Sequence, residues 1–161
     1  MTNESEKLLD ATGWALLRAL QENARISYAD LGRRVGLTPP AVADRIRRLE
    51  AAGIITGFHA AVNPARLGLE LTAIIRFRSS SELYERVYRV IDGCSEIVEC
   101  HRVTGDDCMV MKAVVRSVEH LEEVIARLAP YGSSNTVLVL SSPVEYRAIG
   151  PTALPREEAS A

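Results

Sequence analysis

The stretch GLTPPAVADRIRRLEAAG, residues 36–53, combines a firm helix start with a charged outer face. Pro39 suits the first position of a helix, where its missing N–H is not needed, and Pro40 still lies within the first turn. We expect the hydroxyl of Thr38 to cap this helix and Gly53 to end it. A buried stripe follows at helical spacing, formed by Val42, Ile46 and Leu49.

Two further helices are predicted before this stretch. Residues 8–24 carry leucines at helical spacing. Ser27 then offers an N-cap with Asp30 three residues on, and Gly36 is a plausible helix end. Two short helices joined by the tight turn VGLT, behind a longer first helix, are typical of a helix-turn-helix domain, which we place over residues 1–53.

Positive charge is concentrated in this domain, although the whole 161-residue chain has a net charge of -2. Residues 25–48 contain six arginines and two acids, a net of +4. Arginine forks bind phosphates and guanine edges, so the pattern favours double-stranded DNA as the partner, with residues 38–48 as recognition helix. Base reading is expected from Ala41, Asp44 and Arg45. The full predicted interface comprises Ser27, Tyr28, Thr38, Pro39, Ala41, Asp44, Arg45, Arg47 and Arg48.

The rest of the chain reads as a linker and a second domain. Residues 54–68 are predicted to hold a hinge strand, IITGFHAAV, and a linker; because a lone strand is unstable, it should pair with its own copy in a second chain. Residues 69–149 show the order βαββαβ, so the fold class is α+β with a C-terminal ferredoxin-like domain. Both faces of residues 108–115 are mostly apolar, which favours packing on a second subunit. Residues 150–161 are expected to form a flexible tail.

Composition excludes several classes of protein. The chain is 47% apolar and 25% charged, an ordinary globular balance, and no apolar run reaches the roughly 18 residues that span a bilayer. With a polar N-terminus we expect a cytoplasmic protein without membrane contact, and three free thiols. Cys100 and His101 are consecutive on a predicted strand and so point to opposite faces. We therefore expect no metal site, no cofactor and no enzyme.

The chain resembles the Lrp/AsnC, or feast/famine, family of transcriptional regulators from about Leu9 to Ile149. The markers are Leu9–Asp10, the block RISYADLGRRVGLTPPAVADRIRRLEAAGIITGFHAAVNPARLG and the segment VTGDDCMVMKAVV. The resemblance implies an N-terminal DNA-binding domain and a C-terminal effector domain called RAM. It also implies homodimers that assemble further, often to octamers, and an amino-acid effector bound between RAM domains.

The resemblance also implies an effector site. Its turn corresponds to Thr104, Gly105, Asp106 and Asp107, and the hydroxyls of a neighbouring subunit correspond to Ser134 and Thr136. This chain departs from the family pattern because Cys108 and Met109 replace an acid and an aromatic residue. Gly13 replaces a family aspartate on the first helix, where glycine is expected to cost about 1 kcal/mol relative to alanine.

A second function class stays open. The C-terminal half could be a ferredoxin-like sensor or enzyme whose helix-turn-helix docks to protein rather than to DNA. The two readings differ in what Arg45 does: only the first predicts that Arg45→Ala lowers affinity for specific DNA, by about 1–3 kcal/mol.

Overall fold

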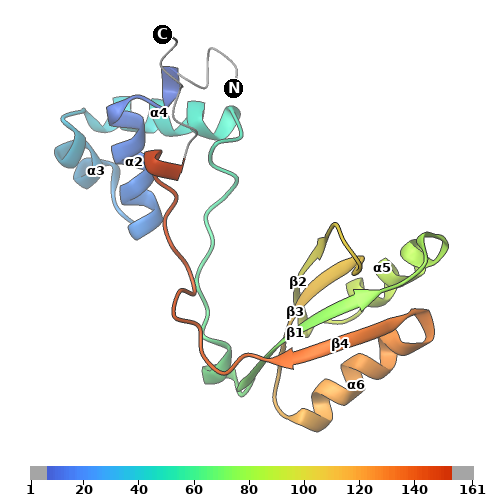
Figure 1. Ribbon diagram of the computed structural model, residues 1–161. Coiled ribbons are helices and arrows are strands. Elements are labelled where there is room, and N and C mark those ends of the chain that lie inside the picture. Colours follow the sequence, from blue (N-terminus) through green and yellow to red (C-terminus); the bar gives the residue numbers. More distant parts are fainter. Residues whose placement is uncertain (1–6, 154–161) are drawn as a thin grey trace. The chain divides into compact units, whose positions relative to one another are not determined.

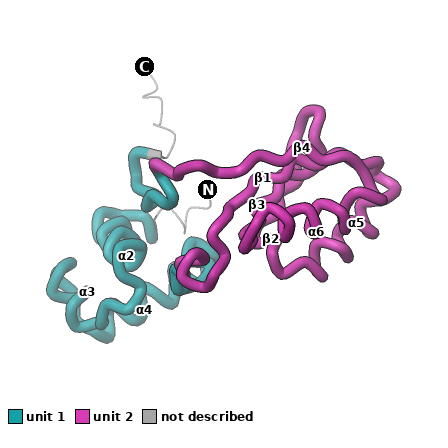
Figure 2. The backbone as a smooth tube through the Cα atoms, turned by 90° about the horizontal axis from the view of Figure 1, so that it is seen from below, with its two compact units in different colours: residues 1–61, 144–161 teal, residues 62–143 magenta. Residues whose placement is uncertain are grey.

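The computed structural model describes residues 7–153, which fall into two compact units. The first unit contains the chain up to residue 61 together with the segment from residue 144, and the second contains residues 62–143 (Figure 2). The predicted α+β fold is confirmed, with helices in the first unit and a sheet with helices in the second (Figure 1).

The first unit is built on three helices: α2 (Ala11–Glu22), α3 (Tyr28–Val35) and α4 (Pro39–Ala51). As predicted, the hydroxyl of Ser27 accepts a hydrogen bond from the Asp30 N–H and caps α3. Thr38 occupies the N-cap position of α4, but its predicted capping bond is absent. The physical reason is that prolines at the first two helical positions have no N–H, so few donors remain to be satisfied.

The turn between α3 and α4 depends on two glycines. Gly36 ends α3 with a φ of 71°, a left-handed conformation that glycine adopts without strain. A side chain on Gly32 would overlap the carbonyl oxygen of Leu37, whose N–H donates to the Gly32 carbonyl at 3.0 Å. This close approach lets the apolar sides of the three helices share one core of Leu16, Ala19, Leu20, Leu31, Val42 and Ile46.

Gly13 has a role that helix propensity does not reveal. A methyl group at this position would overlap the carbonyl oxygen of Leu8, at the chain segment that enters α2. The Gly13 N–H donates to the Asp10 carboxylate at 2.7 Å, which caps α2. The expectation that glycine weakens this helix relative to alanine left out this contact, because an alanine methyl could be placed only if the Leu8 backbone moved.

The hinge strand predicted within residues 54–68 is absent from the single chain. Residues 56–63 have no regular secondary structure, and the 3-10 helix η1 (Pro64–Leu67) follows them. A strand needs a ladder partner, and no strand in residues 7–153 pairs with this segment. Pairing with a second copy stays a prediction.

The second unit has the predicted βαββαβ order. Its elements are β1 (Leu71–Arg78), the 3-10 turn η2 (Ser81–Leu83), α5 (Tyr84–Asp92), β2 (Ile97–Arg102), β3 (Met109–Val115), α6 (Val118–Leu128), the 3-10 turn η3 (Ala129–Tyr131) and β4 (Ser133–Leu138). The strands form one antiparallel sheet in the order β2-β3-β1-β4, and α5 and α6 cover the same face of it (Figure 1).

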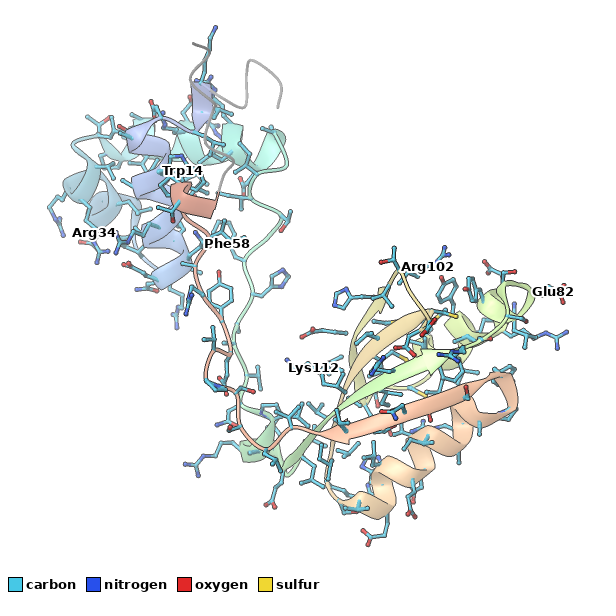
Figure 3. All side chains as sticks on the ribbon, in the orientation of Figure 1. Trp14, Arg34, Phe58, Glu82, Arg102 and Lys112 are labelled. Atoms are coloured by element: carbon cyan, nitrogen blue, oxygen red, sulfur yellow. The ribbon has the colours of Figure 1, made fainter. Side chains whose placement is uncertain are left out.

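The two faces of this sheet differ. Alternate residues of β1 and β3, such as Ile75, Phe77 and Met111, are fully buried and form one core with α5 and α6. On the other face, paired residues include Ile74 opposite Lys112 and Arg76 opposite Val110. Lys112 binds Glu99 at 3.1 Å and lies on the side of the sheet away from the helices (Figure 3). This face therefore mixes apolar and charged side chains, and its packing on a second subunit stays a prediction.

The chain after β4 returns to the first unit. The side-chain amide of Gln21 donates to the Ile149 carbonyl at 3.0 Å and accepts from the Ile149 N–H at 2.9 Å, while the Tyr146 hydroxyl donates to the same Gln21 oxygen. Residues 144–149, assigned by sequence to the second domain, thus pack with the helices of the first. Residues 151–153 of the expected flexible tail form the 3-10 turn η4 (Pro151–Ala153), and the rest of that tail lies outside the described residues.

Candidate functional site

The outward face of α4 is defined by its burial pattern. Val42, Ile46 and Leu49 are buried, as predicted, so the opposite side of the helix faces solvent. That exposed side carries Pro39, Pro40, Ala41, Asp44, Arg47 and Arg48. The Asp44 carboxylate lies 3.2 Å from an Arg47 guanidinium nitrogen, so Asp44 orients its neighbour while both remain accessible. An exposed arginine side on a helix of this length suits insertion into the major groove.

Arg45 does not lie on this outward face as the sequence suggested. Its side chain is 23% exposed and forms an ion pair with Asp10, the residue that caps α2. The reason is helical geometry, because Arg45 lies one turn from both Val42 and Leu49 and so borders the buried stripe. The pKa of Asp10 is lowered, first by the Gly13 N–H and also by Arg45. A role in base reading stays a prediction, but Arg45 already has a partner within the domain.

A second accessible cluster surrounds the start of α3. Ser27 and Tyr28 are exposed, and the Ser27 hydroxyl donates to the Asp30 carboxylate at 2.6 Å. That hydrogen bond, together with Arg33 and Arg34, lowers the pKa of Asp30. Beside them lies a hollow of about 500 Å³, which is lined by Asn23, Arg25, Ile26, Ser27, Asp30, Arg33 and Arg34. Arg34 remains exposed on α3 (Figure 3) although one of its guanidinium nitrogens lies 3.8 Å from the Glu22 carboxylate, so it stays accessible to a phosphate backbone.

The second candidate site is the turn between β2 and β3. It contains the predicted residues Thr104, Gly105, Asp106 and Asp107, with Gly105 in a left-handed conformation at a φ of 102°. Two β1 arginines hold the turn. Nε and Nη2 of Arg76 lie 2.7 and 2.6 Å from one Asp107 carboxylate oxygen, and Nε of Arg78 donates to the Asp106 carbonyl at 2.8 Å.

Sequence reasoning missed both arginines. The available signal was the alternation IIRFR, which buries Ile75 and Phe77 and places both arginines on the opposite face of β1. Which turn they would meet depends on the pairing of β1 with β3, and no local pattern specifies that pairing.

Cys108, at the end of the turn, forms two hydrogen bonds with the backbone of Ser79. Its sulfur donates to the Ser79 carbonyl at 3.1 Å and accepts from the Ser79 N–H at 3.2 Å. The Ser79 N–H and then the Tyr84 hydroxyl lower the pKa of the Cys108 thiol. The guanidinium carbon of Arg102 lies 5.0 Å from the centre of the Tyr84 ring, and this contact links the end of β2 to α5. Both hydrogen-bonding capacities of the thiol are therefore used within the domain.

The predicted hydroxyls Ser134 and Thr136 lie on the edge strand β4. They pair with Phe77 and Ile75, so they share the sheet face that α5 and α6 cover. The hydroxyl of Thr136 is buried and has no hydrogen-bond partner among residues 7–153. Within one chain, Ser133 and Asn135 instead share the face of Arg78 and Arg76. Whether Ser134 and Thr136 complete the site of a neighbouring subunit stays a prediction.

The second unit also contains a charged cluster that does not include the turn between β2 and β3. Arg127 donates to the Glu96 carboxylate at 2.8 Å, and His120 lies 3.0 Å from the same oxygen. The Arg116 N–H donates to Nδ1 of His120, which places the ring proton on Nε2, facing Glu96. These contacts, led by the Arg127 hydrogen bond, lower the pKa of Glu96 to about 2.

In residues 7–153 no group of three or more His, Cys, Asp or Glu side chains is arranged to hold a metal ion. Cys100 and His101 pair with Met111 and Val110, two residues on opposite sides of β3. Over the same part of the chain, no helix has the length and apolar character that crossing a membrane requires.

Known proteins resemble this chain over most of its length. Two family models match it, the AsnC-type helix-turn-helix domain over residues 9–50 and the Lrp/AsnC ligand binding domain over residues 72–149. The HTH-type transcriptional regulator LrpC of Bacillus subtilis is 32% identical over 133 residues, which cover 83% of this chain and 92% of LrpC. The leucine-responsive regulatory protein of Escherichia coli K12 is 33% identical over 141 residues, covering 83% and 86%. The solved feast or famine regulatory protein from M. tuberculosis, complexed with L-methionine, matches with a TM-score of 0.82 at 26% identity, covering 89% of this chain and 99% of that one.

Proposed function

Because this chain belongs to the Lrp/AsnC family of transcriptional regulators, we propose that it binds specific double-stranded DNA through α4 and the start of α3. The observation that carries the proposal is the solvent-exposed side of α4, with Arg47 and Arg48, in the matched helix-turn-helix domain. The hollow lined by Arg25, Arg33 and Arg34 supports phosphate contacts beside it.

The effector part of the proposal concerns the second domain, which matches the family's ligand-binding domain. An amino acid binds at the turn Thr104–Asp107, between effector domains of different subunits, and shifts the population of assemblies that hold the helix pairs at the correct spacing. The M. tuberculosis protein complexed with L-methionine supports an amino acid as the ligand class. The protein acts in the cytoplasm as a homodimer that assembles further, up to an octamer, and reads a palindromic site.

The DNA-binding proposal is tested by selecting bound duplexes from a randomised library at near-physiological salt. Enrichment of a palindromic site is expected. Arg47→Ala and Arg48→Ala should each weaken binding to that site by about tenfold or more. Arg86→Ala, an exposed arginine on α5, is the matched control and should bind like the parent. Weak, salt-sensitive binding with no enriched site, also in the presence of an amino-acid mixture, would contradict the proposal and favour protein docking.

The effector proposal has its own experiment. Each of the twenty common amino acids is added to the parent protein, and thermal unfolding and affinity for the selected duplex are measured. At least one amino acid should raise the unfolding temperature, because a ligand that binds only the folded state stabilises it. The same amino acid should change DNA affinity or the size of the assembly, measured by light scattering. If no amino acid does either, the effector is not an amino acid.

A further inference from the structure

We propose that Arg78 binds the carboxylate of the effector and that Asp106 binds its ammonium group, while the Arg76–Asp107 ion pair only holds the turn in place. This inference rests on the proposed amino-acid effector and assigns its two charged groups to particular side chains. Arg76 and Arg78 belong to β1 and were absent from the site expected by sequence. Asp107, which was part of that expected site, becomes a positioning residue.

Asp107 is already occupied by a stronger partner than an ammonium group. Two guanidinium nitrogens of Arg76 contact the same Asp107 oxygen, and the Asp107 side chain is 17% exposed. Charge-assisted hydrogen bonds of this kind are among the strongest in proteins. An ammonium group at Asp107 would have to displace Arg76 or share with it the Asp107 oxygen that it contacts. We therefore infer that this carboxylate stabilises the turn and does not bind the ligand.

Asp106 differs from its neighbour because only its backbone is used. Its carbonyl accepts from Arg78, whereas its carboxylate has no hydrogen bond or ion pair with any residue from 7 to 153. The residue is exposed, and the neighbouring Gly105 has a left-handed φ of 102°. Asp106 is therefore the acid of this turn that can accept an ammonium group.

Arg78 supplies the complementary charge beside it. Its Nε is fixed on the Asp106 carbonyl, and among residues 7–153 its two terminal nitrogens have no acidic partner. Its backbone is held by the pairing of β1 with β4, in which Arg78 lies opposite Ser133. A guanidinium fixed in this way can bind a carboxylate without losing much side-chain freedom. The turn thus offers one free acid and one free guanidinium, which match the two charges of an α-amino acid.

The departure of this chain at Cys108 fits the same assignment. The thiol donates to and accepts from Ser79, so it adds no free charge where the family pattern has an acid. The acid that remains free is Asp106. The assignment therefore depends on contacts of the turn itself and uses no residue of the buried core.

The test compares ligand analogues on matched variants. The amino acid that binds the parent most tightly is prepared also as its carboxamide, which lacks the carboxylate charge, and as its deaminated acid, which lacks the ammonium group. Binding is measured by calorimetry on the parent, Arg78→Gln, Asp106→Asn and the control Arg86→Gln. Unfolding temperatures without ligand show whether each variant is folded.

Removing one partner of a charged hydrogen bond is expected to weaken binding about tenfold. The parent should bind the amino acid about tenfold more tightly than either analogue. Arg78→Gln should bind the amino acid about tenfold more weakly than the parent does, but should bind the carboxamide as the parent does. Asp106→Asn should likewise bind the amino acid about tenfold more weakly, but should bind the deaminated acid as the parent does. A purely structural role would weaken amino acid and analogue equally, and that result overturns the inference.

Two other outcomes separate this inference from the proposed function. If Arg78→Gln binds the amino acid as tightly as the parent, the assignment of Arg78 is wrong while the amino-acid effector stands. If no amino acid binds the parent, the effector proposal itself is wrong, and the inference fails with it. If the parent binds the carboxamide and the deaminated acid as tightly as the amino acid, the inference is overturned even where a variant does not fold.

Discussion

Gly13 illustrates how a contact with a single backbone atom can determine which residue is most stable at a position. Helix propensity favours alanine over glycine by about 1 kcal/mol, yet the carbonyl oxygen of Leu8 occupies the space that an alanine methyl would need. The same glycine donates its N–H to the Asp10 cap. At the residue scale, the approach of one backbone to another therefore outweighs an intrinsic preference.

We predict that Gly13→Ala lowers the free energy of unfolding by about 1–3 kcal/mol, the usual cost of forcing extra volume into a packed site. Urea unfolding followed by circular dichroism measures it. Gly93→Ala is the matched control, because Gly93 has a φ of -81° and its nearest neighbour to an added methyl lies at 3.5 Å. It should be neutral or slightly stabilising. A stabilised Gly13→Ala would mean that the segment before α2 moves aside freely.

Arg45 and Arg47 should separate stability from DNA binding, although they lie two residues apart. Arg45→Ala removes the partner of Asp10 and should lower the unfolding temperature. Arg47→Ala should leave that temperature unchanged and lower affinity for the selected duplex by about 1–3 kcal/mol. Thermal unfolding and a competition binding assay measure the two effects. An Arg45→Ala protein of unchanged stability but lost DNA binding would instead favour the base-reading role predicted for Arg45.

At the scale of elements, the join between β2 and α6 depends on charge. Glu96 precedes β2, and it binds Arg127 and His120 of α6 through one carboxylate oxygen. Its side chain is only 15% exposed, so the contacts are poorly screened by solvent. Protonation of this carboxyl would remove the acceptor that joins the two elements.

We predict an acid-sensitive contribution to stability from this join. The pKa of Glu96 is lowered from 4.5 to about 2 in the folded protein, so its contribution is fully present above pH 4.5 and is lost as the pH falls toward 2. The contribution is on the order of 2 kcal/mol. Glu96→Gln should be less stable than the parent at pH 7, and the difference should shrink between pH 4.5 and 2. A difference that is independent of pH would exclude Glu96 as the titrating group.

At the scale of the whole molecule, the segment between the domains has no ladder partner in one chain. The sequence predicts a strand in this segment, yet residues 56–63 form none. Two apolar side chains of the segment are exposed, Phe58 at 47% and Val62 at 64%. An unpaired segment with exposed apolar side chains gains hydrogen bonds and burial by pairing with a copy of itself.

Pairing of this segment should be visible in hydrogen exchange. We predict that the backbone amides of residues 56–62 exchange slowly in samples that light scattering shows to be dimeric and rapidly in dilute monomeric samples. The amides of β3 serve as internal control, because they are protected within one chain at any concentration. Rapid exchange of residues 56–62 in a dimeric sample would mean that the dimer forms elsewhere.

Much of this protein follows from local pattern. The prolines and buried stripe of α4, the Ser27 cap, the glycine turn at Gly36 and the strand-like segments depend on a few neighbouring residues. They could therefore be predicted from the sequence, together with the helix-turn-helix and βαββαβ orders. The assignment of the turn Thr104–Asp107 to an effector site came from the family resemblance. These features are specified by steric preference and hydrogen bonding between neighbours in the chain.

Other features needed the tertiary structure because their partners are distant in sequence. Strand pairing brings Arg76 and Arg78 to a turn about thirty residues later in the chain. There Arg76 binds the Asp107 carboxylate, whereas Arg78 binds only the backbone carbonyl of Asp106. The packing of the first unit pairs Arg45 with Asp10, favours glycine at position 13 and brings the chain after β4 back to Gln21. The sequence alone thus determined which elements form and in what order. Only packing decided which side chains meet, because such contacts depend on the three-dimensional register of elements and not on spacing along the chain.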